Sequence, residues 1–122
     1  MRHAALRRYF RHGMLPQLMV FEAVARHGSF TRAGVELSLA QPTVSVQVRK
    51  LSESLELPLI EPSVRKVVLT EAGKEVYETV QGLIRFFIAA DERLEAVRRL
   101  RAAHASRADP AIATLVGETG AG

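Results

Sequence analysis

Short polar side chains gather where a helix is predicted to begin, and their chemistry suits contact with nucleic acid bases. Gln41, Thr43, Ser45 and Gln47 follow a break in the helical pattern at residues 38–40. A glutamine amide can form two hydrogen bonds to adenine, and a threonine methyl can contact the methyl of thymine. These residues predict a helix that reads base edges in a major groove. An ordinary three-helix bundle with a solvated polar face would have the same pattern.

Basic side chains flank this polar group on both sides. Arg32 precedes it, Arg49 and Lys50 follow it, and Arg65 and Lys66 lie in a predicted turn further along the chain. Lysine and arginine bind nucleic acids mainly by neutralising backbone phosphates. We therefore expect phosphate contacts from these side chains, with the 65–66 pair at the tip of a wing.

Residues suited to catalysis or metal binding show no comparable pattern. The chain has no cysteine, and its histidines are scattered without the spacing of metal ligands. No glycine-rich loop follows a predicted strand and opens a helix. We expect a protein that is not an enzyme and that uses no metal or cofactor.

Turn residues and apolar periodicity place the polar group in a small helical head. They predict helices over residues 16–27, 29–37 and about 41–55, with Ser29 as a cap and Pro42 in a first turn. Prolines then forbid further helix, and residues 59–60 and 67–69 predict a small β-hairpin.

A long helix is predicted from Thr70 to about residue 105. Its apolar residues alternate at spacings of four and three, which is the pattern of a heptad seam. No other part of the chain is large enough to bury this face, so we expect the helix to pair with a second copy. The predicted seam is Val76, Val80, Leu83, Phe87, Ala90, Leu94 and Val97.

Composition agrees with a small DNA-binding protein but does not require one. The chain has 122 residues, 48% of them hydrophobic, and a formal net charge of +4. Residues 1–13 form a basic extension with four arginines and no acid, and residues 106–122 predict a flexible tail. No stretch reaches the ~20 apolar residues that span a bilayer, and no secretory signal is evident. We expect a cytoplasmic protein that is not associated with a membrane.

Several linked motifs together resemble LysR-type transcriptional regulators. These motifs are VFEAVA at 20–25, GSFTRA at 28–33, QPTVS at 41–45 and LTEAG at 69–73. The QPTVS motif and EVYET at 75–79 are most similar to the subgroup that regulates Calvin-cycle (RuBisCO) operons.

The resemblance implies a mainly α fold: a winged helix-turn-helix over residues 14–69 and a dimerising linker helix over 70–105. The helix-turn-helix would cover about residues 30–49. Bases would be read by Gln41, Pro42, Thr43 and Ser45, and phosphates bound by Arg32 and Arg49, with Arg65 and Lys66 in the wing. The partners would be double-stranded DNA and a second copy of the chain, in the bacterial cytoplasm at the nucleoid.

The resemblance ends near residue 105, where family members continue into an effector-binding domain. Residues 112–116 would be a remnant of its first strand, so we expect no small-molecule effector. The chain also departs from the family pattern. Ala40 replaces a capping Ser or Thr, Glu56 replaces a helix-ending Gly, Gly34 replaces a helical Ala, and Pro62 and Val64 alter the wing. Two alternatives therefore stay open: a truncated protein that pairs with an intact family member and inhibits it, or a non-functional remnant.

Overall fold

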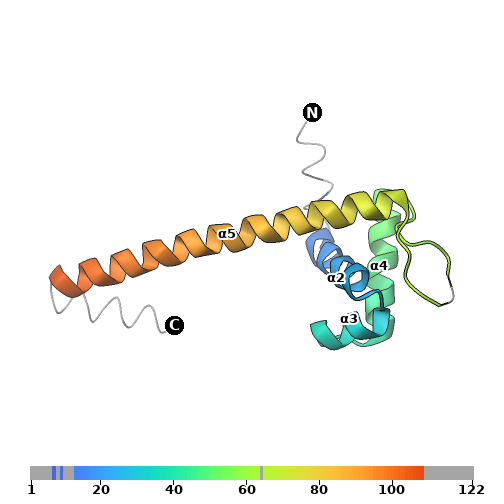
Figure 1. The fold of residues 1–122 in the computed structure, drawn as a ribbon, viewed down its shortest axis with the longest axis horizontal. Helices are drawn as coiled ribbons and strands as arrows, with labels where there is room; N and C mark the ends of the chain where they lie inside the picture. The colour runs from blue at the N-terminus through green and yellow to red at the C-terminus, as the bar shows by residue number, and fades with distance from the viewer. Residues whose placement is uncertain (1–6, 8, 10–12, 64, 109–122) are drawn as a thin grey trace. The chain divides into compact units, whose positions relative to one another are not determined.

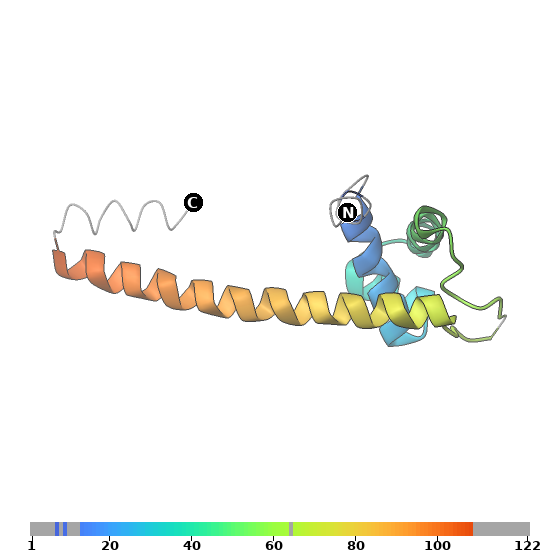
Figure 2. The same cartoon turned by 90° about the horizontal axis from the view of Figure 1, so that it is seen from above.

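The computed structural model describes residues 7, 9, 13–63 and 65–108, and these residues are mainly helical (Figures 1 and 2). The chain divides into two compact units, residues 1–83 and 84–122. Most of the predicted 1–13 extension lies outside the described residues. The predicted 112–116 remnant lies wholly outside them. The helices are α2 (Met14–His27), α3 (Phe30–Leu37), α4 (Gln41–Leu55) and α5 (Glu71–Ala108).

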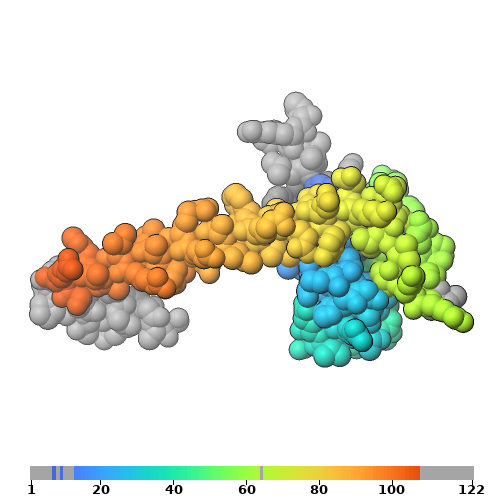
Figure 3. Space-filling view, viewed as in Figure 1, coloured from blue at the N-terminus to red at the C-terminus, as the bar shows by residue number. Residues whose placement is uncertain are grey.

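The head is built from α2, α3 and α4, each of which packs against the other two. Within the first unit, α2 lies against the first turns of α5, as Figure 3 shows. Apolar side chains from every part of the head meet in one core and supply most of its stability. The largest fully buried side chains are Phe21, Val24, Val44, Leu51, Leu59 and Val80.

The turn between α3 and α4 is tight because a glycine lies beside it. The amide of Leu39 donates to the carbonyl of Gly34 over 2.9 Å, and Ser38 adopts a left-handed conformation with φ 55°. A Cβ on Gly34 would lie 2.6 Å from the Leu39 carbonyl oxygen. Gly34, one of the departures from the family pattern, therefore makes room for this close approach.

The two ends of α4 show how the chain accommodates its departures from the family pattern. Ala40 is the N-cap and offers no side-chain hydrogen bond, while Pro42 occupies the first turn. At the other end Glu56 adopts a left-handed conformation with φ 57°, where glycine is ordinarily preferred. The helix has its predicted bounds, but neither end has the favoured residue.

Replacing Glu56 with glycine should stabilise the head. Glycine carries no Cβ and adopts φ 57° without the penalty of ~1 kcal/mol that other residues bear there. We expect the free energy of unfolding, measured by urea titration, to rise by about 1 kcal/mol. Glu56→Ala is the matched control, since it removes the same charge but keeps the Cβ. Equal gains in both variants would contradict this explanation.

The wing is smaller than the predicted β-hairpin. Among the described residues no strand is formed, and the two sides of the loop meet in one antiparallel bridge between Ile60 and Leu69. Beside this bridge the amide of Glu61 donates to the carbonyl of Val68 over 2.7 Å. Pro62 follows immediately and has no N–H to extend the ladder. The departure at Val64 lies outside the described residues.

Thr70, where the long helix is predicted to begin, caps α5 and also contacts the base of the wing. Its hydroxyl accepts a hydrogen bond from the amide of Gly73 over 3.0 Å and donates to the carbonyl of Pro58 over 2.6 Å. A Cβ on Gly73 would overlap the Leu59 carbonyl, so glycine is required for this contact. At its other end α5 continues to Ala108, and the expectation of a flexible tail from residue 106 is wrong for residues 106–108.

The predicted seam divides into buried and exposed members. Val80 is 1% exposed and belongs to the core of its own head, so it is not free to contact a partner. Heptad spacing alone does not distinguish a residue buried in its own head from one left exposed for a partner. Val76, Leu83 and Ala90 are half-buried. Within the second unit Phe87, Leu94 and Val97 are 57%, 53% and 50% exposed.

Candidate nucleic-acid interface

The predicted base-reading residues lie on the exposed first turns of α4. Gln41, Pro42 and Thr43 are exposed and Ser45 is half-buried, whereas Val44 is fully buried. The Gln41 amide donates from Nε2 to the Ser45 hydroxyl oxygen over 2.9 Å. This bond restrains the amide, which keeps its carbonyl oxygen and a second N–H for an external partner.

A polar stripe continues from these residues along α4. Gln41, Ser45 and Arg49 are spaced four residues apart, which puts them on one side of the helix. Arg49 Nε lies 3.9 Å from Glu53 Oε1, and both side chains are well exposed. The four-residue spacing of Arg49 and Glu53 could have revealed this ion pair in the sequence. Lys50 is also exposed, and it lies on a different side of α4 from Arg49.

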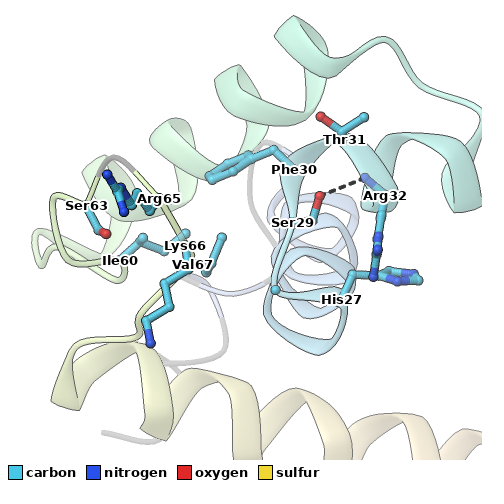
Figure 4. A pocket seen from close by; sticks show the side chains of 11 residues that line it. His27, Ser29, Phe30, Thr31, Arg32, Ile60, Ser63, Arg65, Lys66 and Val67 are labelled. Atoms are coloured by element: carbon cyan, nitrogen blue, oxygen red, sulfur yellow. Dashed lines mark hydrogen bonds between the residues drawn. The ribbon is translucent and has the colours of Figure 1, made fainter.

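The other basic residues of the predicted site, Arg32, Arg65 and Lys66, help to line a cleft of about 480 Å³. This cleft lies between the start of α3 and the wing. Figure 4 shows Arg65 and Lys66 on the wing side, Arg32 on the helix side and Phe30 between them. The amide of Arg32 donates to the Ser29 hydroxyl, which caps α3. The structure thus divides the predicted site residues into two groups, one on α4 and one around this cleft.

A cluster of charges that the sequence analysis missed ties α3 to α2. Arg26 donates to Glu22 from Nε over 2.8 Å and to Glu36 from Nη1 and Nη2 over 2.9 and 2.6 Å. The Glu22 side chain is only 5% exposed. His27 Nε2 lies 2.7 Å from Glu36 Oε1. The four-residue spacing of Glu22 and Arg26 could have indicated their pair, but Glu36 joins it only through the tertiary fold.

These contacts change the acid–base properties of the cluster. Hydrogen bonds from Arg26 and then His27 lower the pKa of Glu36 from about 4.5 to about 2. Hydrogen bonds to Glu36 and Glu22 raise the pKa of Arg26 further above its usual range. Arg26 therefore stays charged, and Glu36 stays ionised at any pH near neutral.

Acid should weaken the link between α2 and α3. Because folding lowers the pKa of Glu36 from about 4.5 to about 2, its contribution to stability is complete above pH 4.5 and is lost as the pH falls to 2. We expect urea unfolding across this window to depend less steeply on pH in Glu36→Gln than in the wild type. Glu78→Gln removes an exposed carboxylate elsewhere and serves as control. Parallel pH profiles for Glu36→Gln and the wild type would contradict the role of this cluster.

Within the described residues no cluster of histidine and carboxylate side chains is arranged to hold a metal ion. None of the helices in that same part of the chain has the length and apolar character needed to cross a membrane.

The three-helix head, the tight turn between α3 and α4 and the wing define a winged helix-turn-helix protein. Residues 15–74 match the family model described as bacterial regulatory helix-turn-helix protein, lysR family. The chain belongs to the LysR family.

Relatives and solved structures agree with this assignment. The chain is 48% identical over 87 residues to a RuBisCO operon transcriptional regulator of Allochromatium vinosum, covering 71% of this chain and 29% of that protein. It is 33% identical to BenM_DBD in a complex with catB site 1 DNA, with a TM-score of 0.58, covering 71% of this chain and 93% of that one. CbnR_DBD in a DNA complex is 30% identical, with a TM-score of 0.61, and the match covers 67% of this chain and 94% of that one. The predicted resemblance to LysR-type regulators, including those of RuBisCO operons, is confirmed.

Proposed function

We propose that this chain binds double-stranded DNA sequence-specifically, as a homodimer, and acts in transcription regulation rather than as an enzyme. The observation that carries the proposal is the arrangement of α4, whose first turns expose Gln41 and Thr43 while the neighbouring Val44 is buried in the core. A recognition helix needs this combination, because its first side chains must reach base edges while its other face fixes it to the head. The solved DNA complexes among the related structures support it.

The roles of individual side chains follow from their chemistry. Gln41, Pro42, Thr43 and Ser45 would contact bases through hydrogen bonds and apolar groups. Phosphates of the two strands would be bound by Arg32, Arg49, Lys50, Arg65 and Lys66. The cleft between α3 and the wing is lined by three of these cations, Arg32, Arg65 and Lys66, and would face one strand of the backbone.

Dimerisation through α5 would bring two recognition helices to one face of the duplex. The exposed Phe87, Leu94 and Val97 supply an apolar face for a second copy. The same face would accept α5 of another LysR-family chain, so heterodimers are a second candidate function. Relatives named as RuBisCO operon regulators favour targets of that class, and the bacterial cytoplasm, at the nucleoid, is the proposed location.

The dependence of DNA affinity on salt tests the phosphate contacts. Each lost phosphate contact should reduce the slope of log K against log salt by about one unit. We expect this reduction in Arg49→Ala and in Arg65→Ala, measured by fluorescence anisotropy on one duplex. Arg101→Ala, an exposed arginine late in α5, is the matched control and should keep the wild-type slope. Wild-type slopes in all three variants would place the DNA on another surface.

A further inference from the structure

We propose that Gln81 and Glu22 fix the docking of α5 on the head and thereby determine the spacing of DNA half-sites that the dimer accepts. This inference rests on the proposed function, since it concerns how two heads meet one duplex. It assigns a positioning role to Gln81 and Glu22, which belong neither to the predicted site residues on α4 nor to those around the cleft.

The contact between the two helices is short, partly buried and directional. Gln81 Nε2 on α5 donates to Glu22 Oε2 on α2 over 2.7 Å, although the residues are 59 positions apart in the sequence. The Glu22 side chain is 5% exposed, so few water molecules can compete for its oxygens. Apolar contacts such as those of the neighbouring Val80 resist separation of the helices but have little directional preference. The hydrogen bond restrains the rotation of α5 on α2 because its geometry depends on angle.

Glu22 is itself held in place from the other side. Arg26 donates to its Oε2 over 2.8 Å and to its Oε1 over 3.1 Å. Arg26 also forms two hydrogen bonds to Glu36 on α3. The acceptor for Gln81 therefore cannot turn away without breaking contacts with a charged partner. A continuous network joins α5, α2 and α3, and α3 is in turn packed on the recognition helix α4.

This network bears on DNA specificity because α5 is one helix from Glu71 to Ala108. A partner that binds its later turns carries a second head, whose recognition helix must reach the next half-site. The distance between half-sites depends on the geometry of the dimer. A docking contact that restrains α5 at Gln81 therefore selects the half-site distances that both heads can occupy together.

The test is a series of duplexes that carry two identical half-sites, with their separation changed one base pair at a time. The wild type should prefer one separation over its neighbours. Gln81→Met keeps the length of the side chain but not the donor, and should reduce that preference by about tenfold, as expected for loss of a hydrogen bond to a charged group. Its affinity for a single half-site should stay unchanged. Gln81→Lys keeps a donor toward Glu22 and should restore the preference, while Glu78→Met, exposed on the same helix, is the matched control.

Each outcome has a distinct meaning. An unchanged spacing profile in Gln81→Met would overturn the inference and leave the proposed function standing. Equal weakening at every separation and on the single half-site would show a role in folding alone, which also overturns it. If the wild type bound duplexes without a preferred separation, the positioning role would be wrong. Failure of the wild type to bind any duplex would overturn the proposed function as well.

Discussion

Replacing Phe87 with glutamate should turn the proposed dimer into monomers and weaken binding to a duplex with two half-sites by a factor of about 10² to 10⁴. Phe87 is 57% exposed in the described structure, so the substitution introduces charge into the proposed interface without removing a buried side chain from its own fold. The loss is large because the second head of a dimer binds intramolecularly, at a high effective concentration. Sedimentation equilibrium measures the first effect, and anisotropy titrations measure the second.

Ile88 provides a closely matched control for Phe87. It is the next residue on the same helix, is 56% exposed, and lies outside the heptad positions. Ile88→Glu should therefore remain a dimer and bind DNA as the wild type does. Leu83→Glu is a poorer test, because Leu83 is half-buried in the head unit and its loss would disturb folding as well as pairing. A dimeric Phe87→Glu protein, or a monomeric Ile88→Glu protein, would place the interface elsewhere.

Replacing Gln41 with alanine should reduce discrimination at one base pair of each half-site by about 10- to 100-fold. A good bidentate contact from glutamine to adenine contributes about 1–3 kcal/mol of discrimination against the wrong base. The bond from Gln41 to Ser45 holds the amide at the exposed start of α4, so the free side chain is already restrained for binding. Affinity for unrelated duplexes should stay unchanged, because it depends mainly on the cations.

Competition between matched duplexes that differ at single base pairs measures this effect. Ser45→Ala should weaken the same preference to a smaller extent, since it removes the acceptor that restrains Gln41. Ser54→Ala changes an exposed serine near the end of α4 and serves as control. If Gln41→Ala kept the wild-type preference at every position, the recognition face assigned to α4 would be wrong.

Local signals in the sequence were sufficient to predict most of the fold. Ser29 and Thr70 cap the helices that follow them, and both hydroxyls accept the expected amide hydrogen bonds. The glycine after α2 adopts the left-handed conformation typical of a helix end, with φ 65°. Such signals lie within a few residues of the feature they specify, which is why the sequence reveals them.

Features that depend on tertiary contacts were harder to predict. Heptad spacing treats Val80 and Phe87 alike, yet one is buried in its own head and the other is exposed. The extent of the wing depends on how residues on either side of its tip pair across the loop. The contact between Gln81 and Glu22 joins segments far apart in sequence, and no local pattern predicts it. For the interface, side-chain type indicated the candidate residues, but their division between α4 and the cleft required the fold.

The central claim, that the chain is a dimeric reader of DNA sequence, is tested most directly by selection from a pool of random duplexes at two salt concentrations. The purified protein is incubated with the pool, and the enriched sequences are determined. We expect a palindromic motif, because two identical heads related by a two-fold axis read identical half-sites. Binding should weaken steeply with salt as phosphate contacts are lost. Salt-sensitive binding without any enriched motif would contradict the account, because it would mean that the positive charge attracts DNA but α4 does not read its sequence.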